Sequence, residues 1–392
     1  MNPGNARRAF PASTGECRLL SKSYKRSLVI GLLLLAAGFY AMSMRPTLKH
    51  IRGQTMGTTY SITYTATPFS HSSDDIKKKA DILLEAVNDS MSTYRNDSEL
   101  MQFNRSEIGK PFKASDELVD LVERSLVISR MSDGVYDVTV GPLVNLWGFG
   151  PADADKQPAA NAANASSSDE QKAPEFIEWM LKNYPAELPS DEDVAAARAK
   201  VGYQFVIADT RNNQLTRNKD VFVDLSSIAK GYGVDKVAYM LESEGIKSYM
   251  VEIGGEVKVG DPKPDGTPWK LGIRGPAMAG NKPALIVALE RQALATSGDY
   301  LNYFEVDGQK YSHTINPKTG HPEMGRLAEV AVIHDNVAEA DALATLFMVL
   351  GDKEGLKLAN REGIAAHFTY HTDKGYETVN SDAFIPYLPK QN

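Results

Sequence analysis

The chain has 392 residues, a hydrophobic fraction of 42% and a formal net charge of -7. A chain of this length forms two domains or one large elaborated domain. Its mild acidity gives no support to nucleic-acid binding, which needs a basic face, but it leaves a nucleotide ligand open. The single cysteine, Cys17, excludes a disulfide framework and a cysteine-based metal site.

The N-terminal 44 residues indicate export. A basic region, residues 1–27, precedes the apolar run Leu28–Met44, and this order is typical of a signal peptide or a membrane anchor. Ala41-Met42-Ser43 fits a small-x-small cleavage site, and cleavage stays open. No cysteine follows the run, so a lipoprotein anchor is unavailable. We expect a protein anchored in the inner membrane or secreted, with residues 45–392 forming a body on the periplasmic side.

The first half of this body begins at about Gln54. Alternating apolar residues predict a strand over Thr58–Ala66, and helical periodicity predicts helices over Asp74–Met91 and from Ser115 to Ser132. Ser132–Pro151 is rich in glycine, proline and aromatic residues and predicts either a well-packed loop or a ligand-lining turn. Residues 151–174 contain almost no large apolar side chain, so we expect a flexible surface insertion there.

In the second half, Ser190 is an expected N-cap, and strands alternate with helices. The predicted helices are Ala229–Glu244 and Asn336–Gly351. The predicted strands are Tyr203–Ala208, Val221–Leu225, a pair within Tyr249–Gly260, Ala284–Glu290, Gln292–Gly298, Leu301–Val306, Leu327–His334 and Ile364–Tyr370. Several neighbouring strands form hairpins, which favours an α+β fold with mixed or antiparallel sheets over a doubly wound parallel sheet.

The segment Val223–Val237 predicts a strand followed by a helix, with Asp224 at the strand end and Lys230 in the turn. Free amides at a helix start, together with a lysine, would suit a phosphate group. A capped helix start with an exposed lysine is equally compatible. The glycine and lysine order of a Walker A loop is absent.

Two further loops have ambiguous chemistry. Gly254-Gly255 is better explained as a hairpin turn that needs positive φ than as a close approach of backbone to a ligand. The loop Tyr311–Pro322 contains His313, a candidate general base or phosphate donor, and His321 competes for that role. A structural histidine is an equal alternative. Zinc ligand clusters and a Gly-x-Ser-x-Gly elbow are both missing from the sequence.

The helix Asn336–Gly351 carries Asp341 and Thr345 one turn apart among apolar residues, so both side chains lie on one face. A buried carboxylate needs a cation, a metal or hydrogen-bond donors. Oxygen ligands of this kind suit Mg²⁺, which completes its shell with waters and substrate phosphates. The alternative is an aspartate that binds free amides near a helix start, with Thr345 bonding back to the carbonyl four residues earlier.

Seven ordered stretches resemble the ApbE family of FAD:protein FMN transferases. They are residues 53–63, 91–104, 132–151, 223–237, 252–260, 294–322 and 339–351. The resemblance implies a T-fold-related α+β body and a Mg²⁺-dependent reaction. In that reaction FAD gives its FMN half to a Thr or Ser hydroxyl of an exported flavoprotein, and AMP is released. It also implies acceptors among subunits of membrane electron-transport complexes, such as the sodium-pumping quinone reductase.

The resemblance also implies roles for particular residues. Those implied to line the FAD site are Met56, Tyr94, Val135, Tyr136, Asp137, Asp224, Lys230 and Ile273. Those implied to hold Mg²⁺ are Asp341, Thr345 and an oxygen of Ser227, either its hydroxyl or its backbone carbonyl. His313 is the candidate for proton transfer or phosphate positioning. Asn316 stands where the family often has aspartate, which puts a carboxylate role there in doubt.

Two other functions stay open on the sequence. A flavin carrier would use the same pocket without turnover, and an FAD pyrophosphatase would use water as the acceptor and give FMN and AMP. A catalytic metal at Asp341 and Thr345 would favour an enzyme over a carrier, because simple storage has less need of one.

Overall fold

The computed structural model describes residues 46–68, 70–150, 188–275, 283–298, 303–306 and 309–389, together with residues 27 and 30. Apart from Ile30, the expected signal or anchor run lies outside these ranges, as does the expected insertion at 151–174. Within the described ranges, no helix combines the length and apolarity that a bilayer span requires. The catalytic candidates all belong to one compact unit, Leu48–Thr65 with His71–Asn392.

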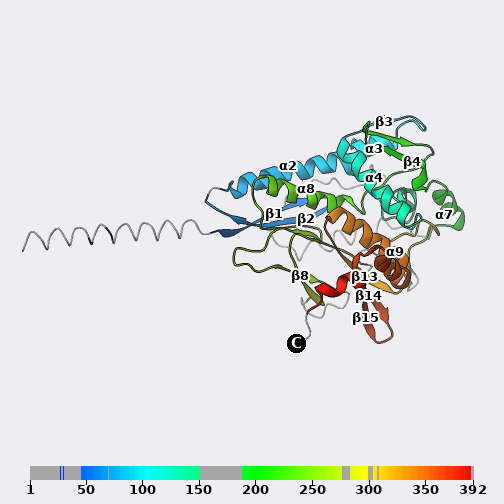
Figure 1. Ribbon diagram of the computed structural model, residues 1–392. Helices are drawn as coiled ribbons and strands as arrows, with labels where there is room; N and C mark the ends of the chain where they lie inside the picture. Colours follow the sequence, from blue (N-terminus) through cyan, green and yellow to red (C-terminus); the bar gives the residue numbers. More distant parts are fainter. Residues whose placement is uncertain are drawn as a thin grey trace, which may run out of the picture. The chain divides into compact units, whose positions relative to one another are not determined.

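An eight-stranded sheet organises this unit (Figure 1). Its strands, in spatial order, are β1 (Thr47–Thr55), β2 (Thr58–Ala66), β6 (Tyr249–Ile253), β7 (Glu256–Val259), β10 (Ala293–Gly298), β13 (Leu327–His334), β14 (Ala365–Thr372) and β15 (Gly375–Asn380). The pairings from β2 to β15 are all antiparallel. The expectation of antiparallel sheets with packed helices is therefore confirmed.

Three smaller sheets accompany the large one. They are β3 (Phe112–Lys113) with β5 (Gln214–Arg217) and β4 (Val206–Asp209), β8 (Trp269–Ile273) with β9 (Leu285–Leu289), and β11 (Tyr303–Val306) with β12 (Gln309–Ser312). The helices are α2 (Ser73–Met91), α3 (Glu99–Asn104), α4 (Asp116–Met131), α5 (Gly141–Leu146), α7 (Asp191–Arg198), α8 (Ala229–Ser243) and α9 (Val337–Glu362), with 3₁₀ turns η3 (Tyr203–Phe205) and η4 (Asp382–Tyr387).

Local chemistry explains where the predicted helices begin. Ser115 and Ser190 cap α4 and α7, because each hydroxyl accepts a hydrogen bond from the third amide of its helix. Asn336 caps α9 in the same way through the amide of Glu339. The helix α9 runs beyond the predicted end, with a kink at Gly351, where φ is 76° and ψ is 175°.

The large sheet buries a core on each face. On β13, Val330 and Val332 pack with the core that contains α4 and α9. The alternate residues Ala331 and Ile333 pack instead with β8, β9 and η4. Side chains of successive strand residues point to opposite faces, so the sheet separates the two cores. Figure 1 shows α2 and α8 on one side of β1 and β2, with β8 on the other.

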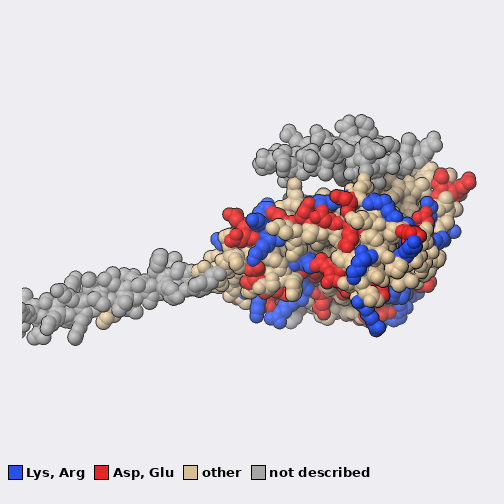
Figure 2. Space-filling view, turned by 90° about the horizontal axis from the view of Figure 1, so that it is seen from above, with Lys and Arg blue, Asp and Glu red and all other residues tan. Residues whose placement is uncertain are grey.

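Surface charges of both signs are mixed on the face that Figure 2 shows. Several form exposed ion pairs, for example Lys77 with Asp81 at 2.7 Å and Lys357 with Glu354 at 2.6 Å. Such pairs contribute about 0–1 kcal/mol each. The charges with energetic consequences are the buried ones described below.

The predicted strand Val221–Leu225 is wrong. The amide of Val223 donates to Oδ1 of Asn104, and Nδ2 of Asn104 donates to the carbonyl of Val223, both at 2.8 Å. The segment forms only an isolated parallel bridge, between Phe222 and Val140, and the Asn104 side chain takes the hydrogen bonds of Val223. Lys230 also differs from its predicted place, because it lies in the first turn of α8 and not in the preceding turn. The body begins before Gln54 with β1, and α5 forms within the predicted Ser132–Pro151 loop.

Candidate active site at the junction of two helices

Helices α8 and α9 approach each other closely at Gly231. A Cβ at this position would lie 2.5 Å from the carbonyl oxygen of Val337 and 2.7 Å from Cα of Ala338. Both neighbours are backbone atoms of α9, which cannot rotate away. Only glycine therefore allows the first turns of the two helices to meet.

Each helix supplies a carboxylate to the start of the other. The amide of Gly231 donates to Oδ2 of Asp341 at 3.1 Å. In return, the amides of Val337 and Ala338 donate to Oδ2 of Asp235, each at 3.0 Å. Helix starts have free amides and a positive dipole, so both contacts are favourable. Asp341 thus binds a free amide at a helix start, as predicted by the alternative to a metal site in the sequence analysis. That amide belongs to α8 and not to α9.

This contact leaves oxygen atoms available around Asp341. Within the described residues, Oδ1 of Asp341 accepts no hydrogen bond. Ser227 precedes the N-cap of α8, Ile228, and among the described residues its carbonyl oxygen accepts no backbone amide. Thr345 lies one turn further along α9 and is half-buried. One carboxylate, one hydroxyl and one carbonyl form a plausible oxygen set for a hard cation.

In the described part of the chain, no three His, Cys, Asp or Glu residues gather closely enough to hold a metal by themselves. This agrees with the chemistry of Mg²⁺, which commonly uses one or two protein carboxylates and takes its other ligands from water and phosphate. The donor set at Asp341, Thr345 and Ser227 therefore fits Mg²⁺, although their assignment as metal ligands stays a prediction.

Lys230 lies between two buried carboxylates. Its Nζ donates to Oε1 of Glu256 at 2.5 Å, and the Asp341 carboxylate acts on it electrostatically. Burial alone would lower the pKa of Lys230, but Asp341 and Glu256 together raise it above its ordinary value. Lys230 is therefore charged at neutral pH, as a phosphate-binding lysine must be.

The two carboxyl groups have raised pKa values. Burial and the nearby Asp341 charge raise the pKa of Glu256, and Lys230 opposes this rise. Burial also raises the pKa of Asp341, while Lys230 and the Gly231 amide oppose that rise. Two buried acids share one ammonium here, and a cation bound beside them would favour their charged forms.

Glu256 was not among the predicted site residues. Its side chain is 2% exposed. Strand alternation contained the missing signal, because Val257 and Val259 belong to the core on the far face of the sheet. Glu256 therefore points to the face that α8 covers, as an acid directly after the Gly254-Gly255 turn. That turn is the predicted hairpin, with φ values of 59° and 104°.

Tyr136 and Ser227 join the loop after α4 to the start of α8. Their hydroxyl groups are hydrogen-bonded at 2.9 Å. Burial raises the pKa of Tyr136, and the charges of Asp341 and Asp224 add to the rise. Asp224 is itself buried and accepts hydrogen bonds at Oδ1 from the amide and hydroxyl of Ser226, at 2.8 and 2.5 Å. One region at the start of α8 is therefore surrounded by four polar residues, namely Tyr136, Ser227, Asp224 and Ser226.

Tyr94 and Met56 lie at the margin of this region. Tyr94 is 54% exposed. Partial desolvation of its hydroxyl group raises its pKa, and the nearby Asp224 charge adds to the rise. Met56 has a positive φ of 49° in the turn between β1 and β2, which is uncommon for a residue with a side chain. Its Cε packs against Gly233 of α8. Both residues present a flat or polarizable surface close to α8.

Three other predicted FAD residues have structural surroundings. Oδ1 of Asp137 accepts from the amide and hydroxyl of Thr139, and its Oδ2 accepts from the amide of Tyr203. Val135 packs against the core that contains α4 and α9. Ile273 is 1% exposed in the opposite core. The structure therefore does not bring the Ile273 side chain together with the Asp341 region, and its contact with FAD stays a prediction.

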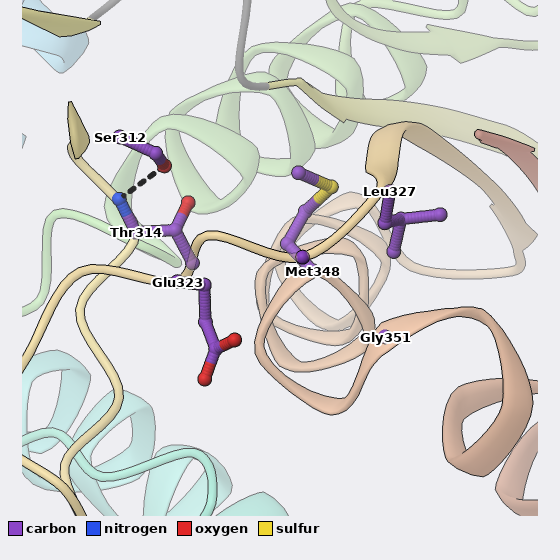
Figure 3. A pocket seen from close by; sticks show the side chains of 7 residues that line it. Ser312, Thr314, Glu323, Leu327, Met348 and Gly351 are labelled. Atoms are coloured by element: carbon purple, nitrogen blue, oxygen red, sulfur yellow. Dashed lines mark hydrogen bonds between the residues drawn. The ribbon is translucent and has the colours of Figure 1, made fainter. Parts of the chain in front are cut away.

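The His313 loop lies further along α9. Ser312 and Thr314 line a cavity of about 30 Å³ with Met348 and Gly351 of α9 (Figure 3). This volume suits about one water and excludes a flavin ring. The His313 ring packs edge-on to Phe149, with centroids 6.3 Å apart. The loop therefore flanks α9 one turn beyond Thr345, and a role for His313 in proton transfer stays a prediction.

Asn316 organises this loop. Its Oδ1 accepts from the amide of Lys318 at 2.8 Å, and its Nδ2 donates to Oε1 of Glu323 at 2.7 Å. The competing histidine, His321, packs edge-on to Trp147. The side-chain amide of Asn316 thus uses both its acceptor and its donor within the loop.

Comparison with known proteins decides the family. The profile of the ApbE family matches residues 56–368. The chain belongs to the ApbE family. A relative from Vibrio cholerae, named FAD:protein FMN transferase, is 40% identical over 342 residues, or 87% of this chain and 93% of the relative. A relative of the same name from Haemophilus influenzae is 34% identical and covers 92% of this chain and 97% of its own.

Solved ApbE structures share the fold. The flavin transferase ApbE from Vibrio cholerae superposes with a TM-score of 0.75 at 38% identity, covering 88% of this chain and all of that one. The apo flavinyl transferase ApbE from Pseudomonas stutzeri gives 0.75 at 35% identity, covering 88% and 98%. The ApbE match spans every predicted site residue from Met56 to Thr345. The α8–α9 junction is thus part of the ApbE fold.

Proposed function

We propose that this ApbE-family chain is a Mg²⁺-dependent transferase. It moves the FMN half of FAD to a threonine or serine hydroxyl of a partner flavoprotein and releases AMP. The observation that carries this proposal is the α8–α9 junction, where Asp341 offers an unbonded carboxylate oxygen beside the charged Lys230. The names of the relatives, FAD:protein FMN transferase, support the same reaction.

The pyrophosphate of FAD needs positive charge around it. Lys230 and the amide end of α8 supply part of it. Asp341, Thr345 and the Ser227 carbonyl would hold Mg²⁺, which supplies Lewis-acid stabilisation of the phosphate oxygens when bound. Tyr94 and Met56 offer flat or polarizable surface for the flavin or the adenine. The residues around α8 thus cover both the charged and the aromatic parts of FAD.

The transfer exchanges a phosphoanhydride bond of FAD for a phosphoester bond to the acceptor. The acceptor hydroxyl oxygen forms a bond to the phosphorus of the FMN half, and the bond from that phosphorus to the bridging oxygen breaks. AMP leaves with the bridging oxygen. We assign the hydroxyl proton to His313, whose loop flanks α9 at Met348 and Gly351, one turn beyond Thr345. Every atom of FAD is then accounted for in the flavinylated acceptor and AMP.

We also propose that the body acts on the periplasmic side, held in or released from the inner membrane through its N-terminal segment. The apolar run Leu28–Met44 after a basic region supports this placement. The acceptors would then be exported flavoprotein subunits of electron-transport complexes, such as the sodium-pumping quinone reductase.

The proposal is tested by incubating the protein with FAD, Mg²⁺ and an acceptor domain that contains a threonine target. The acceptor should become heavier by one FMN and stay fluorescent after denaturation, with one AMP released per adduct. Bound FAD without an adduct would instead indicate a carrier. AMP and free FMN without an adduct would indicate a pyrophosphatase.

The same assay assigns roles to two residues. Asp341→Ala should lower the transfer rate by on the order of 10²–10³ because it removes the charged metal ligand. His313→Ala should lower it by roughly 10²-fold or more if the ring takes the proton. Asp373→Ala, in an exposed turn between β14 and β15, is the matched control and should act as wild type. Full activity of Asp341→Ala would contradict the metal assignment.

A further inference from the structure

Two buried carboxylates lie near Lys230, and its ammonium group forms an ion pair with only one of them. Its Nζ is 2.5 Å from Oε1 of Glu256. Among the described residues, no ion pair within 4.0 Å joins it to Asp341, although the Asp341 charge raises its pKa. The ammonium is therefore near Asp341 but is held on the side of β7.

The ion pair with Lys230 is the main interaction of the Glu256 carboxylate. Its Oε2 is buried and, within the described residues, has no hydrogen-bond partner. The Gly254-Gly255 turn places Glu256 at the first position of β7, on the face toward α8. Burial of an unpaired carboxylate costs free energy. The ion pair with Lys230 offsets this cost for Glu256.

We infer that Glu256 is a positioning residue that draws Lys230 away from Asp341 and so keeps the Asp341 carboxylate open to a divalent cation. The inference rests on the cation site of the proposed function. Oδ2 of Asp341 is occupied by the Gly231 amide, so an ion pair with Lys230 would engage Oδ1, the oxygen that remains for a cation. Glu256 prevents this by holding the Lys230 ammonium at 2.5 Å from its Oε1.

The inference makes a prediction that simple structural support does not. In Glu256→Gln, the buried ammonium of Lys230 loses its charged partner, and Asp341 becomes the nearest anion. Breaking one side of a buried pair leaves an uncompensated charge, whereas removing both charges is often tolerated. Cation binding should therefore weaken in Glu256→Gln and recover when Lys230→Met is added.

The test is a Mn²⁺ titration of the full chain followed by electron paramagnetic resonance, with and without FAD. Glu256→Gln should raise the half-saturating Mn²⁺ concentration by roughly 10- to 100-fold. The double variant Glu256→Gln/Lys230→Met should return to within about threefold of wild type. Glu252→Gln is the matched control, since Glu252 lies on the other strand of the hairpin and binds the Gly255 amide; it should leave the affinity unchanged.

Several results would overturn the inference. One is unchanged Mn²⁺ affinity in Glu256→Gln. Another is a double variant as weak as Glu256→Gln, which would indicate a structural role. Absence of a Mn²⁺ site in wild type would also overturn it. If Glu256→Gln fails to fold, Lys230→Met decides: Mn²⁺ should bind more tightly than in wild type, and weaker binding contradicts the inference.

The outcome is separable from that of the proposed function. The predicted order of Mn²⁺ affinities in a protein that transfers no FMN would support the inference and contradict the transferase. Normal FMN transfer by wild type with unchanged affinity in Glu256→Gln would overturn the inference alone.

Discussion

Gly231 combines two requirements that no other residue type meets. Its amide must reach Asp341, and its Cα must lie against the backbone of Val337 and Ala338. A methyl group at this point would meet atoms that cannot rotate away. The two helices would have to separate, and the Asp341 hydrogen bond would lengthen with them.

We therefore expect Gly231→Ala to lower the free energy of unfolding by roughly 1–3 kcal/mol, as overpacking does. Urea denaturation followed by circular dichroism measures this change. Gly325→Ala is the control, because the nearest atom to its added Cβ is 4.0 Å away; it should stay within about 0.5 kcal/mol of wild type. Equal effects of the two substitutions would contradict the close-contact explanation.

The sequence identified Asp341 but not Asp235 or Glu256, and distance along the chain explains the difference. Asp341 is visible as a lone acid in an apolar helix. The importance of Asp235 depends on Val337, which is 102 residues away. Glu256 matters because of Lys230, 26 residues away. Strand alternation can show which face of the sheet Glu256 occupies, but no local pattern shows that a distant residue is its partner.

At the scale of elements, the helices were predicted well because their signals are local. Ser190 caps the helix that it was expected to cap, and Ser115 lies at the expected start of α4 and caps it. The failed strand Val221–Leu225 depends on Asn104, 119 residues away, which takes the hydrogen bonds that a neighbouring strand would take. A strand-like pattern of side chains shows that a segment fits a half-buried surface of a sheet. It does not show which partner supplies the backbone hydrogen bonds.

The start of α9 depends on Asp235 of α8. Asp235→Ala should lower the free energy of unfolding by about 1–2 kcal/mol, because the Val337 and Ala338 amides lose their acceptor and the helix loses a favourable charge. Asp235→Asn keeps an acceptor and should lose less. Thermal and urea unfolding measure the series, with Asp120→Ala on the exposed face of α4 as control. An Asn variant as unstable as the Ala variant would indicate that charge, not hydrogen bonding, dominates.

At the scale of the molecule, the large sheet separates the candidate site from a second core. The site residues on α8, α9 and β7 lie on one face, and β8, β9 and η4 cover the other. Sequence patterning predicted the α+β class, but strand order and sheet faces depend on pairings between distant segments. The separation implies that stability can change on the far face without a change at the site.

His367 offers a test of this separation. It lies on β14, pairs with Oδ1 of Asn380 at 2.7 Å and stacks on Phe384 of η4 at 5.4 Å. Burial lowers the pKa of His367, and the Asn380 contact only partly opposes this. The folded protein therefore binds fewer protons here than the unfolded chain, whose histidine has a pKa of about 6.5. The contribution of His367 to stability is fully present above that pH and is lost as the pH falls below it.

We expect His367→Gln, which keeps a polar group near Asn380, to reduce the loss of stability between pH 7.5 and pH 5. Urea unfolding at both pH values measures the difference for wild type and variant. Because His367 faces the core opposite α9, FMN transfer by the variant at pH 7.5 should match wild type. If the variant loses as much stability between pH 7.5 and pH 5 as wild type, protonation of His367 does not destabilise the fold. Reduced FMN transfer at pH 7.5 would show that the two faces of the sheet are coupled.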